Sequence, residues 1–159
     1  MKILGIRTAP SVVRYAILTM GEDGAILFEN ANSENKIDFP SDCQKTVEKL
    51  PWLSKEILRI FRQNNDINKI IIKASEYGRG RETTASREAA YYDSAVIIQA
   101  GLQTSPIPVE VKVYRGLGNG IKRNTIKAIA EEKVGKTDKY WNEQMADAVI
   151  AALSGLEIL

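Results

Sequence analysis

The segment at residues 69–74 most restricts the fold of this chain. Its sequence is KIIIKA, in which three consecutive isoleucines stand between two lysines. β-Branched residues favour strands, and an unbroken apolar centre is typical of a strand that is covered on both faces. Such strands belong to α/β proteins, in which helices pack on both sides of the sheet. The segment therefore predicts a central strand of an α/β domain.

Three further strands are expected before this segment, separated by short turn-type sequences. They cover residues 2–7, 11–19 and 25–30. Because the connections are short, these strands predict an antiparallel meander. Residues 30–38 are polar and predict a loop. Apolar residues at helical spacing then predict a helix that begins at Ser41 or Asp42 and has a break or kink at Pro51.

The second half of the chain alternates between helix and strand patterns. We expect helices at 83–101, at 122–134 and from Thr137 or Asp138 to the C-terminus, with a strand at 109–114. The order of elements is β-β-β-α-β-α-β-α-α. A chain of 159 residues with 44% hydrophobic residues has the size and composition of one domain. We therefore expect a single α/β domain over residues 1–159, with the fourth and fifth strands parallel to the first.

Composition excludes several classes of site. The chain has no histidine and one cysteine, Cys43, so it can form neither a Ser/His or Cys/His nucleophile pair nor an intrachain disulfide. No apolar run reaches the length of a membrane span, and the start does not resemble a signal peptide. We expect a cytoplasmic protein with no membrane partner. The net charge of +2 does not by itself indicate a nucleic-acid partner.

Four segments, in order along the chain, share a pattern with one known superfamily. They are KILGIRTAPSVVRYAIL, INKIIIKASE, VEVKVYRGLGNGIKRNTI and EQMADAVIAAL. They resemble, respectively, the first hairpin, the fourth strand, the fifth strand with its glycine loop and lysine-bearing helix start, and the terminal helix of the RuvC-like Holliday-junction resolvases. The resemblance spans nearly the whole chain. It implies a ribonuclease H-like fold, a five-stranded mixed sheet with helices on both faces.

The resemblance also implies where the catalytic site of the family would lie. That family uses several carboxylates to hold two divalent metal ions. The first-strand aspartate falls on Arg7, the fourth-strand glutamate on Ala74, and the paired acids of the last helix on Gln144 and Asp147. Only Asp147 matches, and Glu76 is expected to share the face of Ala74. Because a guanidinium repels metal ions, the resemblance implies a degenerate site with no cofactor.

Asp147 lies in an otherwise apolar run, residues 145–153. A buried charge in such a run needs a partner, whereas an exposed position on the helix would need none. Arg7, at the end of the first strand, either faces solvent or points inward. We expect the two side chains to pair at the position where active relatives hold their metals, because a guanidinium offers parallel N–H groups that match a carboxylate.

Two basic segments, 77–91 and 114–127, are candidates for binding nucleic acid, and we expect them on one side of the molecule. Arginine and tyrosine side chains can hold phosphate and stack on bases, and the sequence GLGNG before a helix start can hold an anion. An ordinary solvated loop or helix face is the alternative for each. The candidates are Tyr77, Arg79, Arg81, Arg87, Arg115, Lys122, Arg123 and Lys127.

Three functions are consistent with these features. The first is a non-catalytic RuvC-like protein that binds nucleic acid, DNA or RNA, or a nucleic-acid-processing partner. The second is a metal-dependent nuclease with Mg²⁺ or Mn²⁺, which needs at least three of the acids Glu76, Asp93, Glu143 and Asp147 within metal-bridging distance. The third is a structural or assembly protein with an apolar patch instead of a basic stripe. The resemblance also raises the expectation of a homodimer.

Overall fold

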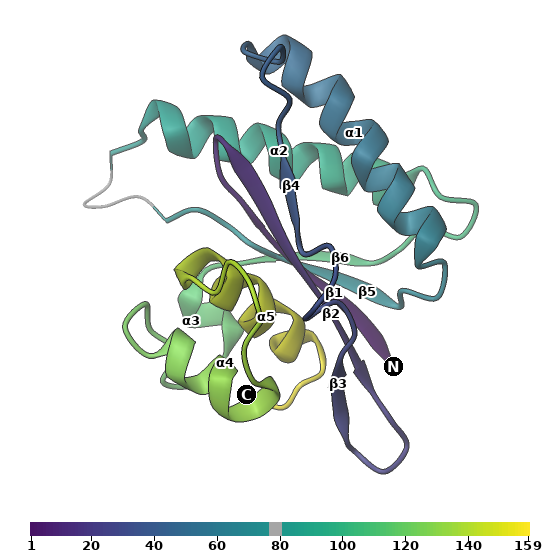
Figure 1. Ribbon diagram of the computed structural model, residues 1–159, viewed down its shortest axis with the longest axis vertical. Coiled ribbons are helices and arrows are strands. Elements are labelled where there is room, and N and C mark those ends of the chain that lie inside the picture. The colour runs from purple at the N-terminus through teal and green to yellow at the C-terminus, as the bar shows by residue number, and fades with distance from the viewer. Residues whose placement is uncertain (77–80) are drawn as a thin grey trace.

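One mixed sheet forms the centre of the molecule (Figure 1). The computed structural model describes residues 1–76 and 81–159. The strands are β1 (Lys2–Thr8), β2 (Val12–Met20), β3 (Ile26–Phe28), β4 (Lys36–Asp38), β5 (Lys69–Lys73) and β6 (Val109–Lys112). Their order is β3-β2-β1-β5-β6, and β4 also pairs with β2. β2 is antiparallel to β1 and β3 to β2, whereas β5 and β6 run parallel to β1, as predicted.

Helices cover both faces of this sheet, which confirms the predicted architecture. On one face lie α1 (Thr46–Gln63) and α2 (Thr84–Gly101), and on the other lie α3 (Tyr114–Leu117), α4 (Ile126–Val134) and α5 (Glu143–Gly155) (Figure 1). Side chains of alternate residues in β1 pack against the two helical layers in turn. Ile3 belongs to the apolar cluster of α4 and α5, and Leu4 to the cluster of α1 and α2. Within the described residues, no helix has both the length and the apolar character needed to cross a membrane.

Two elements of the first half differ from the prediction. The predicted polar loop contains β4, a three-residue strand in which only Ile37 is buried, so it carries no periodic signal. The helix α1 begins at Thr46 rather than at Ser41 or Asp42, because the Glu48 side chain accepts a hydrogen bond from the Lys45 backbone N–H and fixes the helix start there. Pro51 lies inside α1 without ending it.

Helix starts in the second half also differ. α4 begins at Ile126 rather than at 122, after a turn in which the Thr125 backbone N–H donates to the Lys122 carbonyl. α5 begins at Glu143 instead of near residue 137, because the Asn142 side chain accepts the Met145 N–H and caps it. The short helix α3 was not predicted. The predicted helix at 83–101 is confirmed as α2, with Thr83 as its cap.

Glycine allows α5 to lie unusually close to β1. A Cβ on Gly5 would stand 2.0 Å from the carbonyl oxygen of Ala148, and one on Gly155 would stand 2.7 Å from Ile3 Cγ2. Every residue from Met145 to Gly155 is buried, so α5 is a central helix of the molecule. This close approach sets Asp147 beside the end of β1.

Candidate functional site

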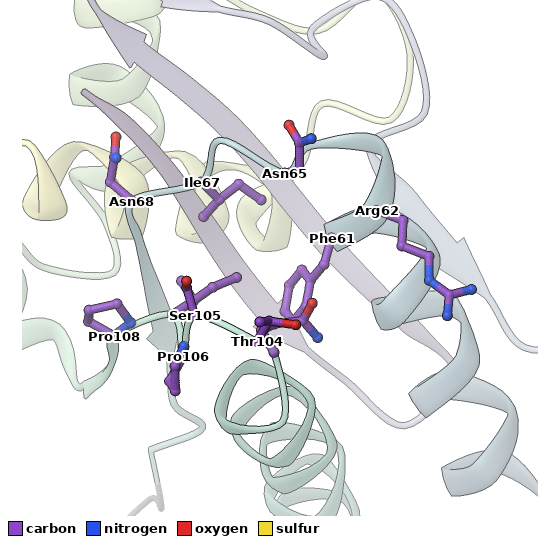
Figure 2. A pocket seen from close by; sticks show the side chains of 11 residues that line it. Phe61, Arg62, Asn65, Ile67, Asn68, Thr104, Ser105, Pro106 and Pro108 are labelled. Carbon is purple, nitrogen blue, oxygen red and sulfur yellow. The ribbon is translucent and has the colours of Figure 1, made fainter.

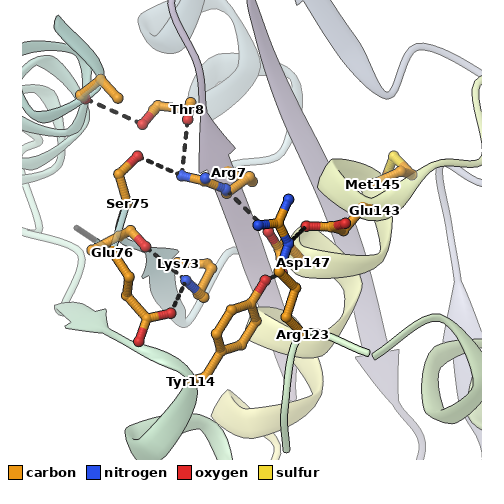
Figure 3. Close-up of polar contacts among 12 residues, drawn as sticks. Arg7, Thr8, Lys73, Ser75, Glu76, Tyr114, Arg123, Glu143, Met145 and Asp147 are labelled. Carbon is orange, nitrogen blue, oxygen red and sulfur yellow. Dashed lines mark hydrogen bonds and ion pairs between the residues drawn. The ribbon is translucent and has the colours of Figure 1, made fainter. Parts of the chain in front are cut away.

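Arg7 and Asp147 meet at the end of β1, which confirms the predicted pairing (Figure 3). Arg7 Nε donates a hydrogen bond of 3.1 Å to Asp147 Oδ2, and Arg7 Nη1 donates to Ser75 Oγ at 2.8 Å. The Tyr114 hydroxyl donates to the other oxygen, Asp147 Oδ1, at 2.9 Å. Asp147 is only 2% exposed. Both of its carboxylate oxygens are therefore hydrogen-bonded inside the protein.

Burial and hydrogen bonding act in opposite directions on Asp147. Burial raises the pKa of its carboxyl group, whereas the Tyr114 hydrogen bond and the positive charges of Arg7 and Lys73 act to lower this pKa. Burial likewise raises the pKa of the Tyr114 phenol, and the neighbouring carboxylate raises it further. Tyr114 is therefore a proton donor to Asp147 and not an acceptor.

Lys73, and not Ala74, is the β5 residue whose side chain enters this site. Residues 71 and 73 share a face because side chains alternate along a strand, and Ile71 belongs to the α5 cluster while Ile72 belongs to the other layer. The Lys73 ammonium is 3.8 Å from the centre of the Tyr114 ring and donates to Glu76 Oε2 at 2.9 Å. Lys73, rather than Ala74, therefore lies beside the Arg7–Asp147 pair, and the alignment of Ala74 with the family glutamate stays a prediction.

A row of basic residues crosses the sheet at the level of this site. Arg7 is paired with Arg14, Arg14 with Lys36, and Lys73 with Lys112, and the pairing of Ile6 with Ile72 places Arg7 next to Lys73. Directly opposed residues on neighbouring strands project to the same face. The row therefore lies under α5 and is made of Lys36, Arg14, Arg7, Lys73 and Lys112. Of these five residues only Arg7 was predicted as a site residue, because the strand register that aligns the row is not visible in the sequence.

Asp93 lies on the opposite face of β1 from Asp147. Thr8, which follows Arg7 and so points the other way, lies with its Oγ1 2.6 Å from Asp93 Oδ1 and 3.1 Å from the Ala89 carbonyl oxygen. Burial raises the pKa of Asp93 to about 6, against the opposing effects of the Thr8 hydrogen bond and of the positive charges of Arg7 and Lys73. The sheet therefore separates the two most buried acids.

The acidic side chains do not fit a divalent metal centre. Within residues 1–76 and 81–159, no three acidic or thiol side chains gather closely enough to hold a metal ion. Glu76 forms an ion pair with Lys73, Glu143 with Arg123, and Asp147 with Arg7. The nuclease alternative requires at least three of the four acids Glu76, Asp93, Glu143 and Asp147 at bridging distance, and among the described residues they are not gathered in this way. Gln144, at the start of α5, is half-buried.

A small hollow of about 160 Å³ opens at the site. Three cations and two acids line it together with Tyr114: Arg7, Lys73, Arg123, Glu76 and Glu143. Figure 3 shows the side chains that surround Asp147. The acids of the hollow are paired with its cations, and the cations and Tyr114 carry N–H and O–H donors. Such a lining suits a hydrogen-bond acceptor better than a metal ion.

The predicted nucleic-acid-binding residues fall into two exposed groups that flank the end of β1. One group is exposed on α3, on α4 and on the segment between them: Arg115, Lys122, Arg123 and Lys127. The other group, Arg81 and Arg87, is exposed around the start of α2. Arg87 pairs with Glu82. The first group is linked to β1 through Tyr114, which donates to Asp147, the partner of Arg7. The second group is linked to β1 through α2, which Thr8 contacts. Tyr77 and Arg79 lie outside the described residues.

Two other hollows carry none of the predicted site residues. One, of about 570 Å³, lies where β5 and β6 begin, and it is lined by uncharged polar side chains such as Asn65 and Thr104 together with Arg62 (Figure 2). The other is an apolar groove of about 300 Å³ between α1 and α2, in which Leu50 faces Tyr91 and Ile98. An apolar surface of this kind was the feature expected of an assembly protein.

Comparison with solved structures identifies the fold. No protein-family model matches the sequence, and no curated protein matches it. The structure of Thermus thermophilus RuvC in complex with a Holliday junction substrate superposes with a TM-score of 0.76 at 11% identity, over 97% of this chain and 92% of that one. The yeast mitochondrial Holliday junction resolvase superposes with a TM-score of 0.61 at 14% identity, over 96% and 77%. The fowlpox virus Holliday junction resolvase superposes with a TM-score of 0.58 at 15% identity, over 100% of both chains. The chain therefore has the ribonuclease H-like fold of RuvC.

Proposed function

We propose that this chain is a non-catalytic RuvC-like protein that binds nucleic acid at the end of the sheet where β1 finishes. The single observation that carries the proposal is that two cations, Arg7 on β1 and Lys73 on β5, lie beside the buried Asp147 at the centre of the sheet. Both side chains place positive charge next to the Asp147 carboxylate. This is the place where the resemblance implies that active relatives hold a metal ion. A guanidinium and an ammonium there repel Mg²⁺ but attract a phosphate.

The exposed basic side chains support binding to a polyanion. Lys122 and Lys127 lie on the same side of the sheet as the Arg7 site, Lys122 just before α4 and Lys127 in its first turn. Lysines that contact phosphates release counterions, so the affinity falls as salt rises. The Thermus thermophilus RuvC structure and a second similar structure, the fowlpox virus resolvase with its substrate, hold Holliday junction DNA, which makes a four-way junction the first ligand to test.

A binding titration tests the proposal directly. A fluorescently labelled four-way junction, a DNA duplex, single-stranded DNA and an RNA duplex are titrated with the protein at several salt concentrations, with EDTA and with Mg²⁺. We expect binding that weakens with salt and is the same in both conditions. No affinity for any of these ligands at low salt would overturn the proposal.

Matched variants locate the binding surface. We expect Lys122→Gln with Lys127→Gln to reduce the slope of log K against log salt by about two, because two phosphate contacts are lost. Lys45→Gln with Lys55→Gln removes the same charge from exposed residues on the α1 side, and we expect binding to remain unchanged. Cleavage of the junction with Mg²⁺ or Mn²⁺, abolished by Asp147→Asn, would instead establish the nuclease alternative.

The apolar groove between α1 and α2 supports self-association as a second candidate property. Tyr91, Ile98 and Leu102 are 46%, 58% and 71% exposed on one side of α2. Exposed large apolar residues that cluster in this way mark interaction surfaces. Light scattering after size exclusion tests for a homodimer, and Ile98→Glu is expected to shift it to monomer. A monomer at all concentrations would reject this candidate.

A further inference from the structure

Arg14 has two buried side-chain donors without hydrogen-bond partners, more than any other side chain that the structure describes. It is 7% exposed, and its Nε and Nη1 atoms are buried with no hydrogen-bond partner among the residues that the structure describes. Buried polar groups are nearly always hydrogen-bonded, and a buried charge without an acceptor is strongly unfavourable. Burial lowers the pKa of Arg14, while the charge of Asp38 acts to raise it. An unsatisfied buried guanidinium points to a missing anion.

The neighbours of Arg14 in the sheet are also positively charged, so they add repulsion that a bound anion would relieve. Its two cross-strand partners are Arg7 on β1 and Lys36 on β4. Arg7 has Asp147 as its acceptor, and Lys36 has Asp38. Arg14 stands between these two cations and is the one member of the row that forms no ion pair within the described residues.

Tyr140 covers Arg14 in a strained conformation. The guanidinium carbon of Arg14 lies 5.3 Å from the centre of the Tyr140 ring, and Lys36 Nζ lies 4.0 Å from the same centre. The backbone of Tyr140 has φ of 63°, a region that bulky residues rarely adopt. Tyr140 as a whole is 52% exposed. Two cations thus share one exposed aromatic ring, held by a backbone that stores strain.

A hollow of about 220 Å³ lies beside Tyr140. Tyr140 lines it together with hydrogen-bond donors from the loop before β4, Asn32 and Ser33, and with Lys139. Asp138 also lines the hollow, where its exposed carboxylate opposes an anion. This hollow provides space next to the Tyr140 side chain.

We propose that Arg14 and Lys36 form an oxyanion-binding site, closed by Tyr140, for a group of the phosphate class. The planar guanidinium supplies the unpaired donors, and Lys36 supplies a second positive charge. Release of the strained Tyr140 backbone offsets part of the energy needed to move the ring. This site is separate from the exposed lysines of the proposed nucleic-acid surface, and it can be tested with phosphate alone.

Trp141 provides a direct readout because it follows Tyr140 in the chain. In a Trp52→Phe background, Trp141 fluorescence is recorded during titration with sodium phosphate, with ionic strength held constant by chloride. We expect a saturable change that chloride does not produce. Arg14→Gln should abolish it, and Lys55→Gln, an exposed residue of α1, should leave it unchanged.

The Tyr140→Asn variant keeps the test decisive if Arg14→Gln does not fold. Asparagine tolerates a positive φ but provides no ring, and a cation–π contact is worth about 1–2 kcal/mol, so we expect phosphate to bind about tenfold more tightly. No saturable response from either the parent or Tyr140→Asn, or an undiminished response in Arg14→Gln, would overturn the proposal.

The source of the phosphate is resolved by adding DNA duplex to the same titration. If the site takes a backbone phosphate, DNA competes with phosphate for the Trp141 response, and if it takes a free phosphate, DNA leaves that response intact. Both outcomes support an oxyanion site at Arg14. Phosphate binding without any DNA binding would reject only the proposed function, and DNA binding without phosphate binding would reject only this site.

Discussion

Arg7 and Asp147 lie 140 positions apart in the sequence and are joined by a 3.1 Å hydrogen bond in the folded protein. Their surroundings differ, because Arg7 also donates to Ser75 Oγ and the Thr8 carbonyl, whereas Asp147 otherwise accepts only from Tyr114 among the hydrogen bonds of the described residues. The carboxylate therefore depends on the pair more than the guanidinium does.

This asymmetry predicts the outcome of a double-mutant cycle. Breaking a buried pair leaves an uncompensated charge and costs about 3 kcal/mol. We expect Arg7→Met to destabilise the protein more than Asp147→Asn, and the double variant to lose less than the sum of the two. Urea unfolding measures the free energies. Strict additivity would show that the two charges do not interact.

The close approach of α5 to β1 predicts that Gly5→Ala is strongly destabilising. The new Cβ would overlap the Ala148 carbonyl, which cannot move without shifting the helix. We expect a loss of about 3 kcal/mol or more. Gly101→Ala, at the end of α2, meets no atom within 4 Å and should be neutral or slightly stabilising. Equal effects of the two substitutions on thermal unfolding would contradict the packing.

The raised pKa of Asp93 predicts that the protein becomes less stable to unfolding as pH rises. Its carboxyl titrates near 3.8 when unfolded and at about 6 when folded, so the folded state holds the proton more tightly. Its favourable contribution is complete below the unfolded pKa and is lost as pH rises through about 6. Relative to Asp93→Asn, the wild type should lose up to about 3 kcal/mol between pH 4 and pH 7.

Denaturant unfolding at several pH values measures this difference. Asp66→Asn serves as the control, because the hydrogen bond from Lys2 lowers the pKa of Asp66 and the sign is reversed. Relative to Asp66→Asn, the wild type should become more stable as pH rises through the Asp66 pKa. A flat difference for Asp93→Asn would mean that this carboxyl is not buried as described.

The position of Lys73 predicts which substitutions create a metal site. Arg7→Asp with Lys73→Glu places two new carboxylates on the face of Asp147, and we expect Mn²⁺ to raise the Tm of this variant through binding to the folded state. Arg7→Asp with Ala74→Glu should gain less, because residue 74 follows Lys73 and alternates away from the site. The reverse ranking in calorimetry with Mn²⁺ would refute the assignment of faces.

Local sequence patterns predicted the topology well because they reflect periodic burial. The isoleucines of β5 and the short connections of the first hairpins were sufficient for a mixed sheet with two helical layers. The pairing of Arg7 with Asp147 was also predicted, since the resemblance to the RuvC-like fold aligned both residues at one place. Helix starts were less accurate, because side chains such as Glu48 and Asn142 fix them through individual hydrogen bonds.

The sequence by itself determined the helical layers of this protein and the relative directions of its strands, because these depend on periodic burial and on the lengths of the connections along the chain. Only the tertiary structure decided what surrounds the site. The strand register aligned Arg14, Arg7 and Lys73 in one row, and the absence of a side chain at Gly5 brought α5 close enough for Asp147 to reach Arg7. Register and close approach depend on contacts between distant segments, and a one-residue shift reverses the face of every side chain.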